Sequence, residues 1–128
     1  MIPKIRVWDK IKKKMYCEDE IASIYFLTQV ISIVEKNDFI NFQDCIIMLS
    51  TRIKDKNKNE IYEGDILYEA GIGNGVVEID MCNGAYLLHK DKKPEKTYFY
   101  ENQERDIYFT VLGNEFENPE LLEDGEIE

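Results

Sequence analysis

The sequence predicts a mainly β fold, and three observations carry that prediction. The segment Lys4–Trp8 alternates, with Ile5 and Val7 on one face, which is the side-chain period of a strand. Later apolar runs such as Cys45–Leu49 are short, as expected for buried strands. Asn83-Gly84 stands between two apolar runs, and this pair favours a two-residue hairpin turn. We therefore expect antiparallel strands joined by tight turns.

The N-terminal segment is expected to form a hairpin. After the strand Lys4–Trp8, the charged segment Asp9–Lys14 has the composition of a turn, and Met15–Cys17 can return as the partner strand. Lys10–Lys14 is also the one basic cluster of the chain, and we interpret it as a solvated hairpin tip.

The segment Ile21–Val34 is ambiguous between helix and strand. It is long enough for a helix, and Ile24, Leu27, Ile31 and Val34 have helical spacing. Its many β-branched and aromatic residues lose rotamer freedom in a helix and suit strands. We expect one or two strands here, which leaves the N-terminal region β-rich with an α+β arrangement as the alternative.

A turn and a strand entry are predicted in the middle of the chain. Asp and Asn residues in Asp55–Asn59 hydrogen-bond their own backbone and tolerate left-handed angles, so a turn is favoured. Gly64 permits a bulge or a positive φ. Asp65 can then accept backbone amides at the entry of the strand Asp65–Tyr68.

The register of the second hairpin follows from its expected turn. With Asn83-Gly84 at the turn centre, Cys82 pairs with Ala85 and Ile79 pairs with Leu88. The apolar face is then the core face and the other face is mostly solvent-exposed. The predicted core positions are Val77, Ile79, Met81, Tyr86 and Leu88, and the predicted exposed positions are Glu78, Asp80, Leu87 and His89.

The C-terminal third is expected to add two strands and a short helical turn. A charged loop, Asp91–Lys96, precedes the strands Thr97–Tyr100 and Ile107–Leu112, and Gly113-Asn114 ends the second of them. Asn118 is suited to cap a helical turn that has Pro119 at its first position. The acidic residues 123–128 are expected to fray.

Composition limits the class of protein. The chain has 128 residues and a formal net charge of −10, which argues against general binding of nucleic acid, because such binding depends on Lys and Arg. Three cysteines without a CxxC spacing, no long apolar run, and an N-terminus without a signal-peptide core favour a cytoplasmic protein with reduced thiols and no membrane span. We expect an N-terminal β-rich subdomain (residues 1–50), a C-terminal domain (51–122) and an acidic tail (123–128).

Metal and cysteine sites find little support in the sequence. Asp55-x-Asn57-x-Asn59 begins like a calcium loop, but Glu60 and Ile66 stand where that loop needs Gly and Glu. One His and three scattered Cys do not suit zinc. Along the predicted hairpin Cys82 lies roughly 13 Å from His89, too far for a catalytic dyad. We therefore expect no metal and no cofactor, with mostly buried thiols and His89 at an edge.

Acidic and aromatic residues provide the remaining candidate sites. Paired carboxylates can bind a divalent metal for hydrolysis, and the candidates are Glu63, Asp65, Glu78 and Asp80. Trp8 either covers the end of a barrel or anchors another subunit or partner, since aromatic residues dominate interface energies. Tyr68 is the second candidate interface residue.

Three segments together resemble the YopX family of small phage and prophage proteins. They are Ile5–Lys10 with Lys14-Met15, Lys54–Ile66, and Leu112–Leu122. The sequence departs from the family at Thr51-Arg52-Ile53, where Thr-Gly-Leu is usual, and at Lys58 or Asn59, where the turn usually has Gly. Residues Glu18–Asp44 match poorly. The motif positions, which we interpret as structural, are Trp8, Asp9, Asp55, Asn57, Tyr62, Gly64, Asp65, Gly113, Asn114, Asn118 and Pro119.

The resemblance implies a mostly β protein with a small SH3-like barrel in its C-terminal half and an origin in a phage or prophage of a bacterial host. It implies no activity, so no catalytic residue or cofactor can be carried over. Our leading hypothesis is a non-enzymatic accessory protein that binds a protein or self-assembles into a homo-oligomer. Its acidity favours a basic host or phage protein as partner. The alternatives are a metal-dependent hydrolase and an acidic mimic of nucleic acid.

Overall fold

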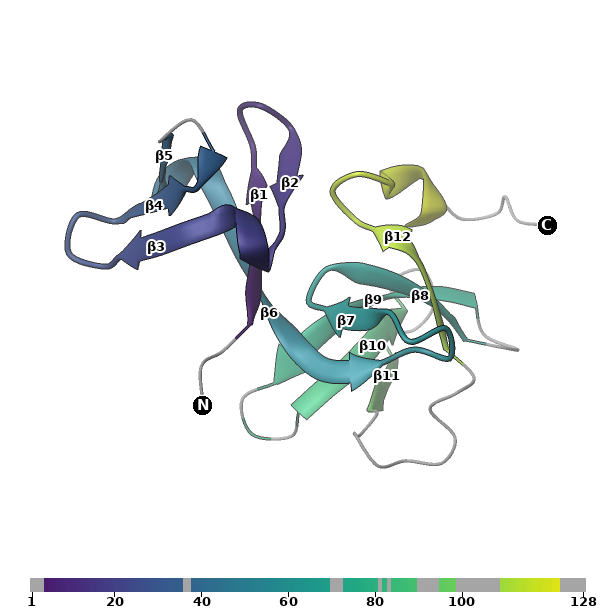
Figure 1. The fold of residues 1–128 in the computed structure, drawn as a ribbon. Coiled ribbons are helices and arrows are strands. Elements are labelled where there is room, and N and C mark those ends of the chain that lie inside the picture. The colour runs from purple at the N-terminus through teal and green to yellow at the C-terminus, as the bar shows by residue number, and fades with distance from the viewer. Residues whose placement is uncertain are drawn as a thin grey trace. The chain divides into compact units, whose positions relative to one another are not determined.

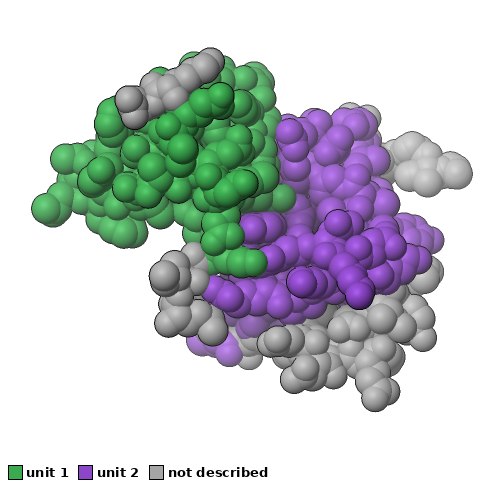
Figure 2. Space-filling view, viewed as in Figure 1, with its two compact units in different colours: residues 1–49 green, residues 50–128 purple. Residues whose placement is uncertain are grey.

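The computed structural model describes residues 4–35, 38–69, 73–80, 82, 84–89, 95–98 and 109–122. It divides into two compact units, residues 1–49 (unit 1) and 50–128 (unit 2) (Figure 2). The fold is mainly β, built from antiparallel strands (Figure 1). Within the described residues, no helix has the length and hydropathy needed to cross a membrane.

The predicted N-terminal hairpin is confirmed. Strand β1 (Ile5–Asp9) pairs antiparallel with β2 (Lys14–Tyr16), and Trp8 lies opposite Met15. The other edge of β1 pairs with the first half of β6 (Cys45–Lys54). The turn between β1 and β2 closes because Lys13 adopts a positive φ of 56° and donates its amide to the carbonyl of Asp9.

The ambiguous segment forms strands rather than a helix. Strands β3 (Ile21–Tyr25) and β4 (Val30–Ile33) form a hairpin, and β5 (Phe39–Asn41) pairs with the other edge of β4. Short 3-10 turns at Glu18–Glu20 and Phe42–Asp44 flank this sheet. The β-branched side chains therefore decided the outcome over the helical spacing.

Unit 1 has its own hydrophobic core. Its buried members come from five strands, and partly buried Ile and Phe residues pack around them. The buried residues are Val7, Tyr16, Ile31, Ile33, Ile40 and Cys45. Alternation explains the set on β4, where Ile31 and Ile33 are buried and Val30 and Ser32 face the other side.

Unit 2 contains a five-stranded antiparallel sheet that curls into a half-barrel (Figure 1). The second half of β6 pairs with β7, and a 3-10 turn at Pro119–Leu122 follows the last strand, as predicted. The SH3-like character of the half-barrel stays a prediction. The remaining strands are β7 (Glu60–Tyr62), β8 (Asp65–Glu69), β9 (Gly73–Asp80), β10 (Gly84–His89), β11 (Glu95–Tyr98) and β12 (Thr110–Asn114), in the sheet order β11-β10-β9-β8-β12.

The predicted register of the β9–β10 hairpin is wrong. Asp80 pairs with Gly84 and Ile79 with Ala85, so Asn83-Gly84 is not the centre of a two-residue turn. Because this shift is an odd number of residues, it exchanges the two faces of β10. Leu87 and His89, predicted to be exposed, are fully buried, whereas Leu88 is half-buried on the opposite face.

Other predicted elements agree more closely with the structure. The strand predicted at Thr97–Tyr100 begins earlier, at Glu95, and is described as far as Tyr98. The last strand, β12, ends at Asn114, as its Gly-Asn pair predicts. The predictions for most of the loop at 91–96, for Ile107 at the start of the last strand, and for the tail at 123–128 lie outside the described residues.

Candidate functional site

The sheet β3-β4-β5 has no charged residue in any of its strands, although a third of the chain is charged. The four residues of the turn between β3 and β4, Phe26–Gln29, are also uncharged. We call these strands and this turn the uncharged sheet. Its inner face covers the core of unit 1 through Ile31 and Ile40. The turn lies at the free end of the β3–β4 hairpin (Figure 1).

Apolar side chains at the end of this hairpin are exposed. Leu27 is 99% exposed and Phe26 75% exposed, and they lie next to Tyr25, which is 47% exposed. Phe39, on the same outer face by strand register, is 64% exposed. An aromatic side chain has an area of ~150–250 Å², so the four together expose on the order of 500 Å². Their summed area is comparable with that of the largest apolar patches on ordinary monomers, ~300–600 Å².

The turn is held by specific contacts. Gln29 has a positive φ of 61° and donates its amide to the carbonyl of Tyr25 at 2.8 Å. Its own carbonyl accepts the amide of Phe42 at 2.8 Å. The Phe26 ring stands edge-on to the ring of Phe42, with centroids 6.2 Å apart. Leu27 is therefore exposed on a turn that backbone hydrogen bonds and the contact of Phe26 with Phe42 anchor.

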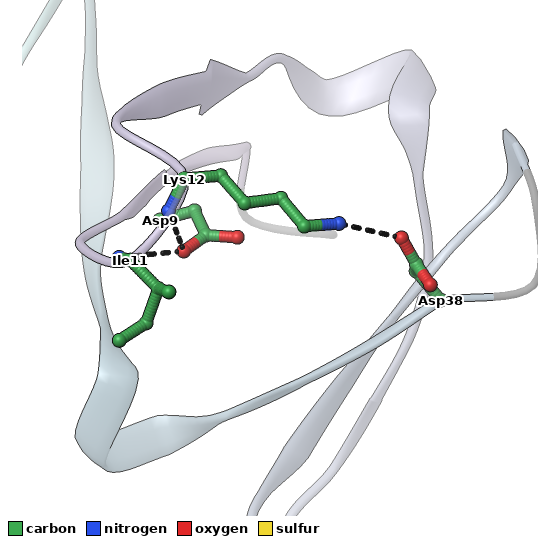
Figure 3. A network of polar contacts seen from close by, with 4 residues as sticks. All are labelled: Asp9, Ile11, Lys12 and Asp38. Carbon is green, nitrogen blue, oxygen red and sulfur yellow. Dashed lines mark hydrogen bonds and ion pairs between the residues drawn. The ribbon is translucent and has the colours of Figure 1, made fainter.

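A second exposed tip among the described residues of unit 1 is basic. Asp9, which is buried, accepts the amides of Ile11 at 2.9 Å and Lys12 at 3.0 Å through Oδ1, and thereby shapes the β1–β2 turn (Figure 3). The Lys12 ammonium contacts Asp38 at 2.8 Å, and this hydrogen bond raises the pKa of Lys12 above its ordinary value. Ile11 is 71% exposed among these lysines. The tip is solvated, as expected for Lys10–Lys14.

Asp55 organises the turn between β6 and β7. Its Oδ1 accepts the amides of Asn57 at 2.9 Å and Asn59 at 2.8 Å, and its Oδ2 accepts the amide of Val111 at 2.9 Å. Burial by itself raises the pKa of Asp55, but these amides outweigh it and hold the pKa below its ordinary value. The carboxylate thus links the turn to β12, and its role is architectural.

Lys58 and Asn59 are the two turn positions at one of which, by the family resemblance, Gly is usual, and Lys58 has the strained backbone of the two. Its φ is 70°, in the left-handed region, and its amide donates to the carbonyl of Asp55 at 2.9 Å. A lysine there carries the steric cost that a glycine avoids. The turn therefore forms with a lysine in the left-handed region, at some expense of stability.

Gly64 and Asp65 open β8 as predicted. Gly64 has a φ of 87° and donates its amide to the carbonyl of Val77, while its carbonyl accepts the amide of Glu115. Asp65 is buried and accepts the amide of Tyr62 at 2.8 Å. Asp65 is therefore engaged in the fold and is not offered to a ligand.

The last motif forms a second turn of the same kind. Asn114 is buried, and its Oδ1 accepts the amides of Phe116 at 3.0 Å and Glu117 at 2.8 Å. Asn118 accepts the Asn114 amide at 3.1 Å. A Cβ added at Gly113 would meet the side chain of Asn118, with Cγ at 2.7 Å. Gly113 is therefore needed for close packing, and Pro119 then begins the 3-10 turn.

Three of the four candidate hydrolase carboxylates accept hydrogen bonds within the fold. Besides Asp65, Glu78 accepts the hydroxyl of Tyr86 at 3.1 Å and Asp80 accepts that of Tyr98 at 3.3 Å. Among the described residues, no group of three or more His, Cys, Asp and Glu side chains is arranged to hold a metal. The pKa of Tyr86 lies above its ordinary value, first because of burial and then because of Glu78.

The histidine and cysteine predictions need correction. His89 is not at an edge but buried, with Nε2 2.8 Å from Glu69 and Nδ1 3.2 Å from the carbonyl of Asn74. All three cysteines lie in the described residues and none forms a disulfide, but Cys17 and Cys82 are exposed and Cys45 alone is buried. Burial raises the pKa of Cys45, which disfavours a reactive thiolate there.

The two candidate interface residues differ in exposure. Trp8 is 8% exposed, which disfavours it as an exposed anchor. Tyr68, on β8, is 46% exposed. Phe26 and Phe39 were not among the candidate residues predicted from the sequence, and Leu27 was noted only for its helical spacing. The absence of charge from Ile21 to Val34 was the pattern that could have found Phe26 and Leu27.

These features define a small two-unit β protein whose motif residues build turns. The chain belongs to the YopX family, because the family model described as YopX protein matches residues 4–123. No match was found among curated proteins.

Two solved structures resemble the chain over almost its whole length. The structure of protein EF1440 from Enterococcus faecalis is 26% identical, with a TM-score of 0.55, and the match covers 96% of this chain and 99% of that one. The structure of yopX from Bacillus subtilis is 16% identical, with a TM-score of 0.59 and coverage of 98% and 100%. The second likeness shows the fold alone.

Proposed function

We propose that this protein is a non-enzymatic protein-binding module that acts through the uncharged sheet of unit 1. The observation that carries the proposal is the exposure of Phe26 and Leu27 on an anchored turn. Exposed apolar patches of this size, rimmed by polar residues, mark interaction sites. A fixed turn also loses less conformational entropy on binding than a loose loop.

The contacts of the motif residues support a binding role over a catalytic one. Four motif residues accept hydrogen bonds from backbone amides through their side-chain oxygens, namely Asp9, Asp55, Asp65 and Asn114. The described carboxylates offer no arrangement suited to a metal. We therefore prefer the binding module to the metal-dependent hydrolase.

The distribution of charge supports a second candidate function, acidic mimicry of nucleic acid. Residues 1–49 contain seven basic and seven acidic residues, so their formal charge is zero. The other nine basic and nineteen acidic residues lie in unit 2, which carries the whole −10. A basic partner would be steered to unit 2 by this field. The proposal for unit 1 is independent of it.

By the family resemblance, we further propose that the protein is a phage or prophage accessory protein in the bacterial cytoplasm. The half-barrel of unit 2 fits the proposed SH3-like barrel. A homo-oligomer fits the uncharged sheet of unit 1, and a basic host or phage protein fits the acidic unit 2. None of these roles requires a cofactor.

The test is a pull-down from host lysate with wild-type protein, Leu27→Asp and Ile11→Asp. Ile11→Asp is the matched control, because it replaces another exposed apolar residue of unit 1 at the basic tip. The proposal expects a bound protein that Leu27→Asp releases and Ile11→Asp keeps. A bound protein that both variants keep, and that salt of about 0.5 M releases, would favour the acidic mimic instead.

A further inference from the structure

The charge distribution limits how two copies of this chain can meet. Unit 2 carries a formal charge of −10 and unit 1 carries none, so an approach through two copies of unit 2 is repulsive. An approach through two uncharged sheets places no charged strand residue in the contact. Electrostatics therefore disfavours a contact through two copies of unit 2 and does not disfavour a contact through two uncharged sheets.

The exposed area matches what one symmetric contact requires. The patch of Tyr25, Phe26, Leu27 and Phe39 exposes on the order of 500 Å² of side chain. Two copies would then bury about 1,000 Å² of apolar surface, and stable interfaces bury ~1,200–2,000 Å² in total. The polar neighbours Ser23, Thr28, Ser32 and Asn41 can supply the remaining rim.

The sheet is better suited to contact through its face and tip than to edge-to-edge extension. The pairing of β3 with β4 shifts register between Ile21 and Ser23. Such a bulge at an edge strand disrupts the flat ladder that another strand would need. The exposed aromatic residues instead lie on the outer face and at the turn.

We propose that the occupant of the uncharged sheet is a second copy of this chain, in a symmetric contact centred on Leu27 and Phe26. This inference rests on the proposed function, since it assigns a partner to the same surface. The contact is of moderate strength, because its area is at the lower end of the range for specific interfaces.

The experiment is sedimentation velocity of the full chain from about 5 to about 500 µM, a range suited to a moderate interface. The proteins are the wild type, Leu27→Asp, Phe39→Lys and the control Ile11→Asp. A symmetric contact includes each substitution twice, so Leu27→Asp is expected to weaken association on the order of 100-fold by burying two carboxylates. Leu27 and Phe39 are exposed, so far-UV circular dichroism is expected to be unchanged.

The expected result is a concentration-dependent dimer of wild type and Ile11→Asp that Leu27→Asp and Phe39→Lys both weaken. Added salt should preserve or strengthen this dimer, because salt screens the repulsion between the acidic units. A wild type that stays monomeric overturns the inference; if Leu27→Asp still releases a captured protein in the pull-down, the proposed function stands with another occupant. An oligomer that neither substitution weakens overturns the assignment of this surface.

Discussion

Replacing Asp55 by Ala is expected to destabilise unit 2 strongly. The carboxylate accepts three backbone amides, from Asn57, Asn59 and Val111, at 2.8–2.9 Å. A hydrogen bond to a charged group contributes ~1.5–3 kcal/mol. Water can replace the carboxylate at Asn57 and Asn59, which are exposed, whereas the amide of Val111 lies against the turn and loses its partner. We therefore expect a loss of about 3 kcal/mol.

The assay is urea unfolding followed by far-UV circular dichroism, with Asp55→Ala, Asp55→Asn and the control Asp19→Asn, which removes an exposed Asp of unit 1. A loss of about 3 kcal/mol is a large part of a total stability of ~5–15 kcal/mol. Asp55→Asn keeps one oxygen acceptor, but its side-chain NH2 group then faces a backbone N–H that also donates. Its loss of unfolding free energy should therefore lie between those of the control and Asp55→Ala.

The pH dependence has a defined sign. The pKa of Asp55 is lowered in the folded state, so its stabilisation is fully present above the unfolded value, ~3.9. It is lost as the pH falls through the folded pKa. The difference between wild type and Asp55→Asn should therefore shrink as the pH is lowered from about 6 to about 3. Equal urea midpoints for all the proteins, or a difference that stays constant in acid, would refute the reasoning.

Three further predictions concern single positions. Lys58→Gly should raise the free energy of unfolding by about 0.5–1 kcal/mol, because it removes the steric strain of a lysine with left-handed backbone angles. The control Lys56→Gly, at a residue outside that region, should lower the free energy of unfolding. Equal effects of the two substitutions in a thermal melt would contradict this. Gly113→Ala should lower the free energy of unfolding by about 1–3 kcal/mol, because its Cβ would clash with Asn118. In a protein that already carries Asn118→Gly the same substitution should cost much less, so additive effects of the two substitutions in urea unfolding would count against this reasoning. The pKa of Tyr86 is raised in the folded state, so its stabilisation is present below the pKa of the unfolded state and is lost as the pH rises through the folded pKa. Tyr86→Phe should therefore reduce the loss of stability above about pH 10. An unchanged dependence of the melting temperature on alkaline pH would argue otherwise.

Much of the local structure follows from the sequence because its causes are local. The alternation in Ile5–Trp8 places β1, and the Asx residues at Asp55 and Asn114 build the turns that their chemistry favours. Gly64 adopts the positive φ expected before a strand. In each case neighbouring residues supply the hydrogen bonds, so a short window of sequence contains the information.

The register of β9 and β10 did not follow, because a turn type alone was used to set it. Asn83-Gly84 fits a two-residue turn, yet the pairing of Asp80 with Gly84 places Leu87 and Val77 together in the core. Burying those two side chains outweighs the preference of a dipeptide for one turn. The burial of His89 follows from the same shift.

The candidate surface was missed for a related reason. The expectation of strands at Ile21–Val34 did not say which face would be buried, and the apolar residues of this segment that pack in the core of unit 1 are Ile21, Ile24, Ile31 and Ile33. Which residues are buried depends on the cover that the other strands of unit 1 provide to one face of the sheet, and that cover is a tertiary property. The absence of charge along the whole segment was visible in the sequence and is what distinguishes an interaction face from an ordinary solvated one.

The central claim is that binding takes place at the uncharged sheet. Amide hydrogen exchange, measured on the full chain at low and at high protein concentration, tests it most directly. Protection is expected to increase with concentration at Tyr25–Val30 and Phe39–Asn41 while β8 and β12 stay unchanged. Protection that increases only in unit 2, with the β3–β4 turn unaffected, would contradict it.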